Sequence, residues 1–189
     1  MHLILASASP RRAELLESAG FSFDVAPSDV DETVQIDEDP KAYALRVALD
    51  KARVAAAHCR KPGSVVLAAD TVVVAQGEIL AKPEGPDDAR RMLKTLSGGV
   101  HEVHTAVVIC AGDRELWDVS TSRVQVLRLS DAEIDWYIGT GEWDGKAGAY
   151  GIQGGFARFI DWLEGSWSNV VGLPVAAVYR LLKEAGECI

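Results

Sequence analysis

Residues 3–20, LILASASPRRAELLESAG, pass from an apolar run through a polar turn into a helical pattern. The run LILA is typical of a short buried strand, and the later leucines and alanines recur at helical spacing until a glycine ends them. Ser9 is the expected N-cap and Pro10 suits the first helical position. Arg11 and Arg12 then fall in the first turn, where the helix dipole is already positive and a cation is mildly unfavourable. We therefore expect a negative group beside them, supplied by the protein or by a ligand.

Beyond this stretch, strand and helix patterns alternate early in the chain and strands cluster late. We expect strands at residues 21–26, 64–69, 72–80, about 100–110 and about 115–128, a last hairpin from 156–163 and 166–171, and helices at about 40–59 and 87–96 and from 131 and 174. This order predicts a mixed α/β fold rather than a purely doubly wound one.

Composition limits the classes of function. The chain has 189 residues, is 48% hydrophobic and carries a formal net charge of −9. Such acidity argues against a nucleic-acid-binding protein, although local cations can still bind a small polyanion. No apolar stretch is long enough to span a bilayer, so no membrane partner is expected. The cysteines at positions 59, 110 and 188 form no Cys-x-x-Cys pair, which favours a reduced, cytoplasmic setting.

Single charged residues give weaker signals. Asp70 directly follows the apolar run 64–69, so it is either a turn aspartate or a ligand-binding carboxylate at a strand end. Lys82 follows the next hairpin and, taken by itself, is interpreted as a solvated charge. Lys51 lies among charged neighbours in a helix, where a solvated face is the simpler interpretation. For Asp31–Glu32, an acidic loop is a simpler interpretation than a metal site.

Seven short blocks, taken in order, are more specific than any one residue. They are SASPRR (7–12), VDET (30–33), KA (51–52), ADTVV (69–73), KP (82–83), KAGAYGIQG (146–154) and VGLP (171–174). Together they closely resemble the Maf family of nucleoside triphosphate pyrophosphatases, over essentially the whole chain as one domain, 1–189. The residues after GIQG depart from the usual pattern, being bulkier and less basic.

The resemblance implies a mixed α/β fold, similar to the inosine-triphosphate pyrophosphatases, with an elongated central sheet, flanking helices and a cleft between two lobes. It implies hydrolysis of a nucleoside triphosphate to the monophosphate and pyrophosphate with Mg²⁺ or Mn²⁺. The subfamily that acts on dTTP and UTP is the most similar. A subfamily acting on 7-methyl-GTP and a non-catalytic nucleotide-binding regulator of septum formation and cell division are the alternatives. The sequence leaves the physiological substrate and the oligomeric state open, a homodimer included.

The resemblance also implies roles for individual residues. The triphosphate would meet the N-terminus of the first helix, and a metal held by two carboxylates would assist the attacking water. Asp70 is implied as the general base and also as a metal ligand, and the sequence does not separate the two roles. The implied metal ligands are Glu32 and Asp70, and the implied substrate-binding residues are Ser7, Ser9, Arg11, Arg12, Lys51, Thr71, Lys82 and Gln153.

Overall fold

The structure is a computed structural model that describes residues 2–59 and 63–187, so Cys188 lies outside it. Its strands form one seven-stranded sheet in the order β2-β1-β3-β5-β6-β7, with β4 paired to β3. β1 is parallel to both β2 and β3, whereas β4 is antiparallel to β3 and β7 to β6. The strands are β1 His2–Leu5, β2 Phe23–Val25, β3 Ser64–Ala75, β4 Glu78–Leu80, β5 Val100–Ala111, β6 Arg114–Val126 and β7 Ile160–Glu164. The predicted mixed α/β fold is confirmed.

Helices complete two compact units. The first unit comprises Met1–Asp70, Thr105–Ser120 and Gly172–Ile189, and the second unit comprises Thr71–His104 and Thr121–Val171. The helices are α1 Pro10–Ser18, α2 Pro40–His58, α3 Pro86–Leu96, α4 Asp131–Thr140, α5 Trp167–Val171 and α6 Val175–Glu184, with short 3₁₀ helices η1 Ala147–Ala149 and η2 Gly154–Phe159. Within the described ranges, no helix is both long and apolar enough to cross a membrane.

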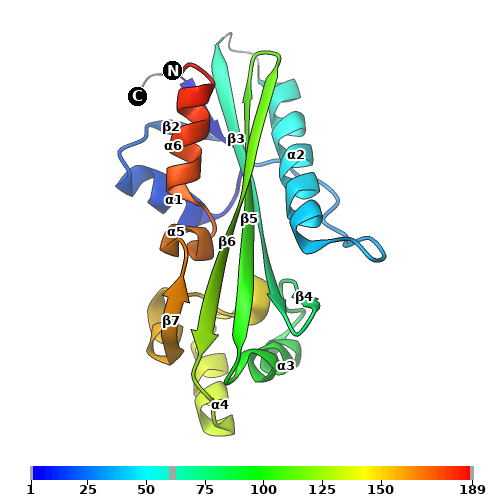
Figure 1. Ribbon diagram of the computed structural model, residues 1–189, viewed down its shortest axis with the longest axis vertical. Coiled ribbons are helices and arrows are strands. Elements are labelled where there is room, and N and C mark those ends of the chain that lie inside the picture. The colour runs from blue at the N-terminus through cyan, green and yellow to red at the C-terminus, as the bar shows by residue number, and fades with distance from the viewer. Residues whose placement is uncertain (1, 60–62, 188–189) are drawn as a thin grey trace. The chain divides into compact units, whose positions relative to one another are not determined.

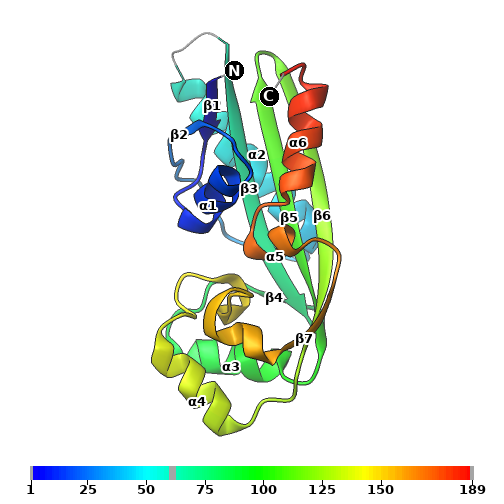
Figure 2. The same cartoon turned by 90° about the vertical axis from the view of Figure 1, so that its left-hand side faces the viewer.

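In the first unit, α2 lies on one face of the sheet, and α1 and α6 lie on the other (Figures 1 and 2). α2 begins as predicted, because Asp39 Oδ2 accepts hydrogen bonds from the backbone N–H groups of Lys41 and Ala42, both at 3.0 Å. Its buried residues recur every three or four positions, so the helix turns one continuous side toward the sheet. Neighbouring β1 is also buried, with Leu3 and Leu5 at 1% and 0% exposure.

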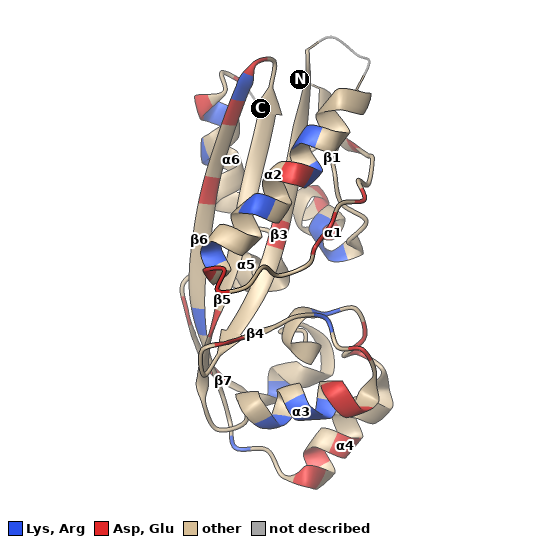
Figure 3. Cartoon of the chain, turned by 90° about the vertical axis from the view of Figure 1, so that its right-hand side faces the viewer, with Lys and Arg blue, Asp and Glu red and all other residues tan. Residues whose placement is uncertain are grey.

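In the second unit, α3 packs against α4. Basic residues of α3 face acidic residues of α4 (Figure 3), where Arg90 pairs with Asp135, and Lys94 with Asp131 at 2.9 Å. α4 starts at the predicted capping box, in which the side chain of Ser130 accepts the N–H of Glu133 and Glu133 reaches back to the N–H of Ser130. Charge pairing and capping therefore fix this helix pair.

The predicted last hairpin is wrong. Only Ile160–Glu164 forms a strand, since residues 154–159 form η2 and Trp167–Val171 forms α5. Phe156 and Phe159, three positions apart in η2, lie on the same side and pack their rings with centroids 5.5 Å apart. Phe156 also contacts the rings of Tyr137 and Tyr150, at 4.9 and 4.8 Å. Burial of these rings fixes the 3₁₀ turn where the aromatic pattern alone suggested a strand.

Candidate active site

The N-terminus of α1 has the features of an anion-binding site. β1 ends at Leu5, and Ala6 donates its N–H to the carbonyl of Leu67 at 2.8 Å before the chain turns. Ser9 is the N-cap residue as predicted, but within the described chain its side chain makes no capping hydrogen bond, and the first turn holds no acidic residue. Ser7 is buried, and its Oγ accepts the N–H of Ser9 at 3.2 Å. The helix end therefore keeps donors that an anion can use.

Arg12 joins this helix end to a part of the first unit that is distant in sequence. Its Nε donates to the carbonyl of Gly172 at 2.8 Å, and its Nη1 donates to Ser7 Oγ at 3.1 Å. Gly172 has φ of 124°, a conformation that side chains rarely adopt. Burial lowers the pKa of the Arg12 guanidinium, as does the neighbouring Arg11, while the charges of Asp70 and Glu32 raise it. The negative groups expected beside the arginine pair thus include two protein carboxylates.

Lys51 is the centre of a buried ion cluster. Its Nζ lies 2.6 Å from Glu32 Oε1 and 2.8 Å from Asp70 Oδ1. Lys51 and Asp70 are both buried, at 8% and 7% exposure, whereas the side chain of Glu32 is 35% exposed. The interpretation of Lys51 as part of a solvated helix face is therefore wrong. Helical spacing could have revealed this, since Lys51 follows Val47 at four positions on the buried side of α2.

Asp70 lies inside β3, not at its end. The strand runs unbroken from Ser64 to Ala75, so the expected separation into two strands around residue 70 is wrong. The strand that ends here is β1, whose last residue pairs with Leu67, three positions before Asp70. Burial raises the pKa of the Asp70 carboxyl, and the cations Lys51 and Arg12 oppose that shift. A carboxylate with a raised pKa is a stronger proton acceptor than one in water.

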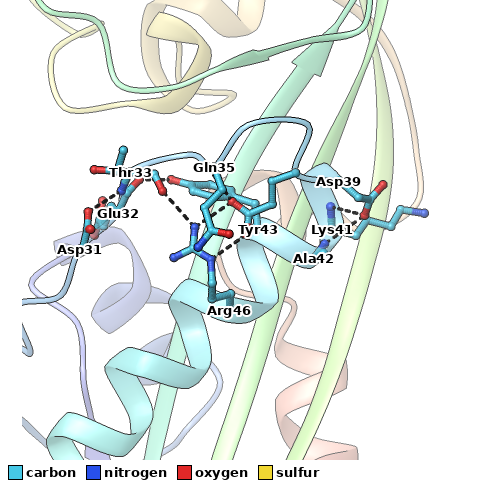
Figure 4. Close-up of polar contacts among 10 residues, drawn as sticks. Asp31, Glu32, Thr33, Gln35, Asp39, Lys41, Ala42, Tyr43 and Arg46 are labelled. Carbon is cyan, nitrogen blue, oxygen red and sulfur yellow. Dashed lines mark hydrogen bonds and ion pairs between the residues drawn. The ribbon is translucent and has the colours of Figure 1, made fainter.

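The segment that carries Glu32 is fastened to α2 (Figure 4). The Tyr43 hydroxyl donates to the backbone carbonyl of Glu32 at 3.0 Å, and Arg46 Nη2 donates to the carbonyl of Thr33 at 3.0 Å. Arg46 also binds both carboxylate oxygens of Glu38, at 2.7 and 2.8 Å, which lowers the pKa of Glu38 to about 2. Sequence reasoning missed Tyr43 and Arg46. Their positions one and two turns after the Asp39 cap were the available signal.

Three predicted substrate-binding residues belong to the second unit. Thr71 directly follows Asp70 in β3, and Lys82 is exposed just after β4. Gln153 is exposed as the residue before η2, and within the described residues its side chain makes no capping bond to that helix. The structure therefore brings Ser7, Arg12, Glu32, Lys51 and Asp70 into one linked network in the first unit, whereas these three residues belong to the second unit.

The donor set suits a hard divalent cation shared with a ligand. Oxygens of Glu32 and Asp70 already converge on one positive charge, the Lys51 ammonium. Across residues 2–59 and 63–187, no three His, Cys, Asp or Glu side chains are grouped as a complete metal cage. Mg²⁺ is commonly held by one or two carboxylates together with substrate phosphates. Two converging carboxylates linked to a helix end that can bind an anion fit this mode of Mg²⁺ coordination.

The sheet and its helices define an α/β fold already seen in a solved structure. A HAM1 protein from Coxiella burnetii matches with a TM-score of 0.57 over all of both chains, at 16% identity. At that identity the similarity is one of fold.

The chain belongs to the Maf-like protein family, whose model matches residues 2–185. Relatives named dTTP/UTP pyrophosphatase include proteins from Koribacter versatilis, Anaeromyxobacter dehalogenans strain 2CP-1 and Caulobacter vibrioides. They are 52%, 53% and 50% identical, and the alignments cover 98%, 97% and 97% of this chain and 95%, 94% and 95% of the relatives. The resemblance drawn from the seven sequence blocks is confirmed.

Proposed function

We propose that this protein is a nucleoside triphosphate pyrophosphatase that hydrolyses dTTP and UTP to the monophosphates and pyrophosphate. The observation that carries the proposal is the near full-length match, at about half identity, to relatives named for this activity. The partly buried cluster of two carboxylates and Lys51, linked to the arginine-bearing helix end, supports it. Binding of a nucleotide alone does not require a carboxylate facing the phosphates.

The proposal assigns the phosphate chain to the first turn of α1 and to lysine and arginine side chains. Backbone N–H groups and the hydroxyls of Ser7 and Ser9 would donate to phosphate oxygens. Arg11 and Arg12 would add charge-assisted hydrogen bonds, and Lys51 and Lys82 would add positive charge. The arginine pair then sits at a positive helix end because the ligand brings the anion.

Asp70 is the proposed general base. It would take a proton from the water that attacks the α-phosphorus, while the bond from that phosphorus to the bridging oxygen breaks and pyrophosphate leaves. Lys51 would keep Asp70 ionised by pairing with its charged form. Glu32 and Asp70 would hold Mg²⁺ or Mn²⁺. A bound metal of this kind supplies a water of lowered pKa and neutralises phosphate charge.

The nucleobase of the substrate would be recognised by hydrogen bonds. The Gln153 amide can donate to a carbonyl of thymine or uracil while accepting from N3–H. Arg11, which only donates, would satisfy the second carbonyl and would leave the amino group of cytosine unpaired. Thr71 is also a proposed substrate-binding residue. This pattern favours dTTP and UTP over CTP.

We also infer a cytoplasmic protein with no nucleic-acid or membrane partner, and a homodimer is compatible with the proposal. Its formal net charge of −9 disfavours binding to polyanions through bulk charge.

Hydrolysis of dTTP in water enriched in ¹⁸O tests the function. The proposal predicts dTMP and pyrophosphate as the only products, with the label in dTMP, because water attacks the α-phosphorus. Label in pyrophosphate would move the attack to the β-phosphorus. Formation of dTDP and phosphate, or no hydrolysis of any nucleoside triphosphate, would refute the proposal.

A further inference from the structure

The segment Tyr150–Gly155, which contains Gln153, is held by side chains from elsewhere in the second unit. Gln153 itself is exposed, whereas Ile152 and Phe156 on either side are buried. At the second residue of the segment, the N–H of Gly151 donates to the Tyr137 hydroxyl at 3.3 Å. Its two ends are fixed by two further contacts, through His101 and Glu142.

At the first end, His101 binds Tyr150. His101 Nε2 lies 2.6 Å from the Tyr150 hydroxyl, and the two rings meet edge to face with centroids 5.2 Å apart. Both residues are buried, at 2% and 5% exposure. In the described part of the chain, His101 Nδ1 has no hydrogen-bond partner, although it is buried.

That unpaired nitrogen argues against a purely space-filling role for His101. An apolar ring at this position would fill the core without leaving a polar atom buried and unsatisfied, which always costs free energy. Burial also lowers the pKa of His101 to about 4, so the ring is neutral near pH 7 and pairs with Tyr150 as a neutral group. The feature that histidine supplies here is the bond to the Tyr150 hydroxyl.

At the other end, Glu142 binds the backbone of the segment. Glu142 Oε2 accepts the N–H of Gly155 at 2.9 Å. Gly154 has φ of 75°, and a Cβ built there would lie 2.6 Å from Glu142 Oε2, so the carboxylate lies tightly against this glycine. Glu142 is itself restrained, because its N–H donates to Thr140 Oγ1 at 3.1 Å and Lys146 donates to its carbonyl.

We propose that His101 and Glu142 are positioning residues that set base selectivity by holding Tyr150–Gly155 at both ends, so that Gln153 is presented in one orientation. This inference rests on the proposed function, in which Gln153 reads the base. A hydrogen-bonding side chain discriminates only when its backbone is held to within a fraction of an ångström. Loosening either end therefore weakens recognition of the base, while the phosphate chain, common to all substrates, is unaffected.

The test compares dTTP with N3-methyl-dTTP, which lacks the N3–H that Gln153 would accept. The measured quantity is the ratio of kcat/KM for the two nucleotides. We expect wild type to prefer dTTP by about tenfold or more, as for loss of a hydrogen bond in a site built to make it. Gln153→Ala should abolish this preference and serves as the reference.

Three variants loosen the segment: His101→Phe, Tyr150→Phe and Glu142→Ala. Each should reduce the dTTP preference severalfold toward the Gln153→Ala value, mainly through KM for dTTP. The double variant His101→Phe/Tyr150→Phe should be no worse than either single variant, because the two residues act as one pair. Tyr150→Phe removes a single oxygen atom, so it carries the test even if His101→Phe does not fold.

Matched controls separate positioning from general damage. His104→Phe changes a buried histidine on the same strand, bonded to Thr121 Oγ1 at 3.0 Å, and Glu133→Ala removes the capping glutamate of α4, whose Oε2 accepts the N–H of Ser130. Both should keep the wild-type ratio even where melting temperature falls. An unchanged ratio in Tyr150→Phe and Glu142→Ala would overturn the inference and leave the pyrophosphatase function intact. Absence of dTTP hydrolysis in wild type would refute the function, and the inference with it.

Discussion

Asp70 is a carboxylate that the protein buries in the middle of a strand. Such a group is stable there because Lys51 lies 2.8 Å away and Arg12 contributes a second positive charge. Burial raises the pKa of its carboxyl, and the two cations oppose that shift. This environment suits a group that must accept a proton near neutral pH.

Replacing Asp70 with asparagine tests that role. The amide keeps the size of the side chain but cannot take a proton, so hydrolysis should fall by at least about 10²-fold, typical of a lost general base. Lys51 keeps Glu32 as a partner at 2.6 Å, so the variant should remain folded by circular dichroism. Asp118→Asn, which changes a carboxylate paired with Arg180 in the same unit, is the control and should retain activity. Wild-type turnover by Asp70→Asn would contradict the assignment.

His101 gives a prediction for pH. Its folded-state pKa of about 4 lies below the ordinary value of 6.5, because burial disfavours the charged ring. As pH falls from about 6.5 to about 4, the unfolded chain binds a proton that the folded protein does not, so the free energy of unfolding decreases. Above that window the contribution is fully present. The melting temperature of wild type should therefore fall more steeply with acid than that of His101→Phe. Equal slopes for the two proteins would contradict the prediction.

Among the elements, the segment between β2 and α2 combines a proposed metal ligand with several contacts to a helix. It is rich in acidic residues (Figure 3), and the first two turns of α2 hold it through Tyr43 and Arg46. One helix thus supplies Lys51 to the ion cluster and also fixes the backbone of Glu32, a proposed metal ligand.

Arg46→Ala should weaken the use of metal. Loss of the bonds to Thr33 and Glu38 would free the segment that carries Glu32, and the Mg²⁺ concentration for half-maximal activity should rise by about tenfold, the low end for loss of a group that supports a metal ligand. Arg53→Ala is a close control, since Arg53 makes an equivalent two-bond contact with Glu115 from the same helix. An identical Mg²⁺ dependence in the two variants would contradict the role of Arg46.

At the scale of the whole molecule, the sequence predicts elements that depend on local chemistry. The Asp39 cap, the Ser130 capping box and the helix after Pro174 were all predicted. The unbroken β3 was not, because the cations that stabilise its buried aspartate, such as Lys51 at 19 positions away, are distant in sequence. The 3₁₀ turn at Phe156 was missed for a related reason, since its rings pack against residues distant in sequence. The candidate site residues were proposed from the family resemblance, whereas the pairing of Lys51 with Glu32 and Asp70 required the structure.

Removal of divalent metal tests whether hydrolysis depends on a bound cation. Excess EDTA should abolish hydrolysis of dTTP, and Mg²⁺ or Mn²⁺ should restore it, because the two carboxylates and the substrate phosphates need a shared cation. The melting temperature should change little, since Lys51 and Arg12 already supply two positive charges beside Glu32 and Asp70 without a metal. Full activity in excess chelator would exclude the proposed metal role.

The protein is proposed to select thymine and uracil nucleotides, and a comparison of kcat/KM for dTTP, UTP, CTP and 7-methyl-GTP tests that claim. We predict similar values for dTTP and UTP, with CTP lower by about tenfold or more because its amino group would leave the Arg11 donor unpaired. We expect 7-methyl-GTP to be the poorest substrate, since a purine presents a different edge to Gln153. A clear preference for 7-methyl-GTP would contradict the claim.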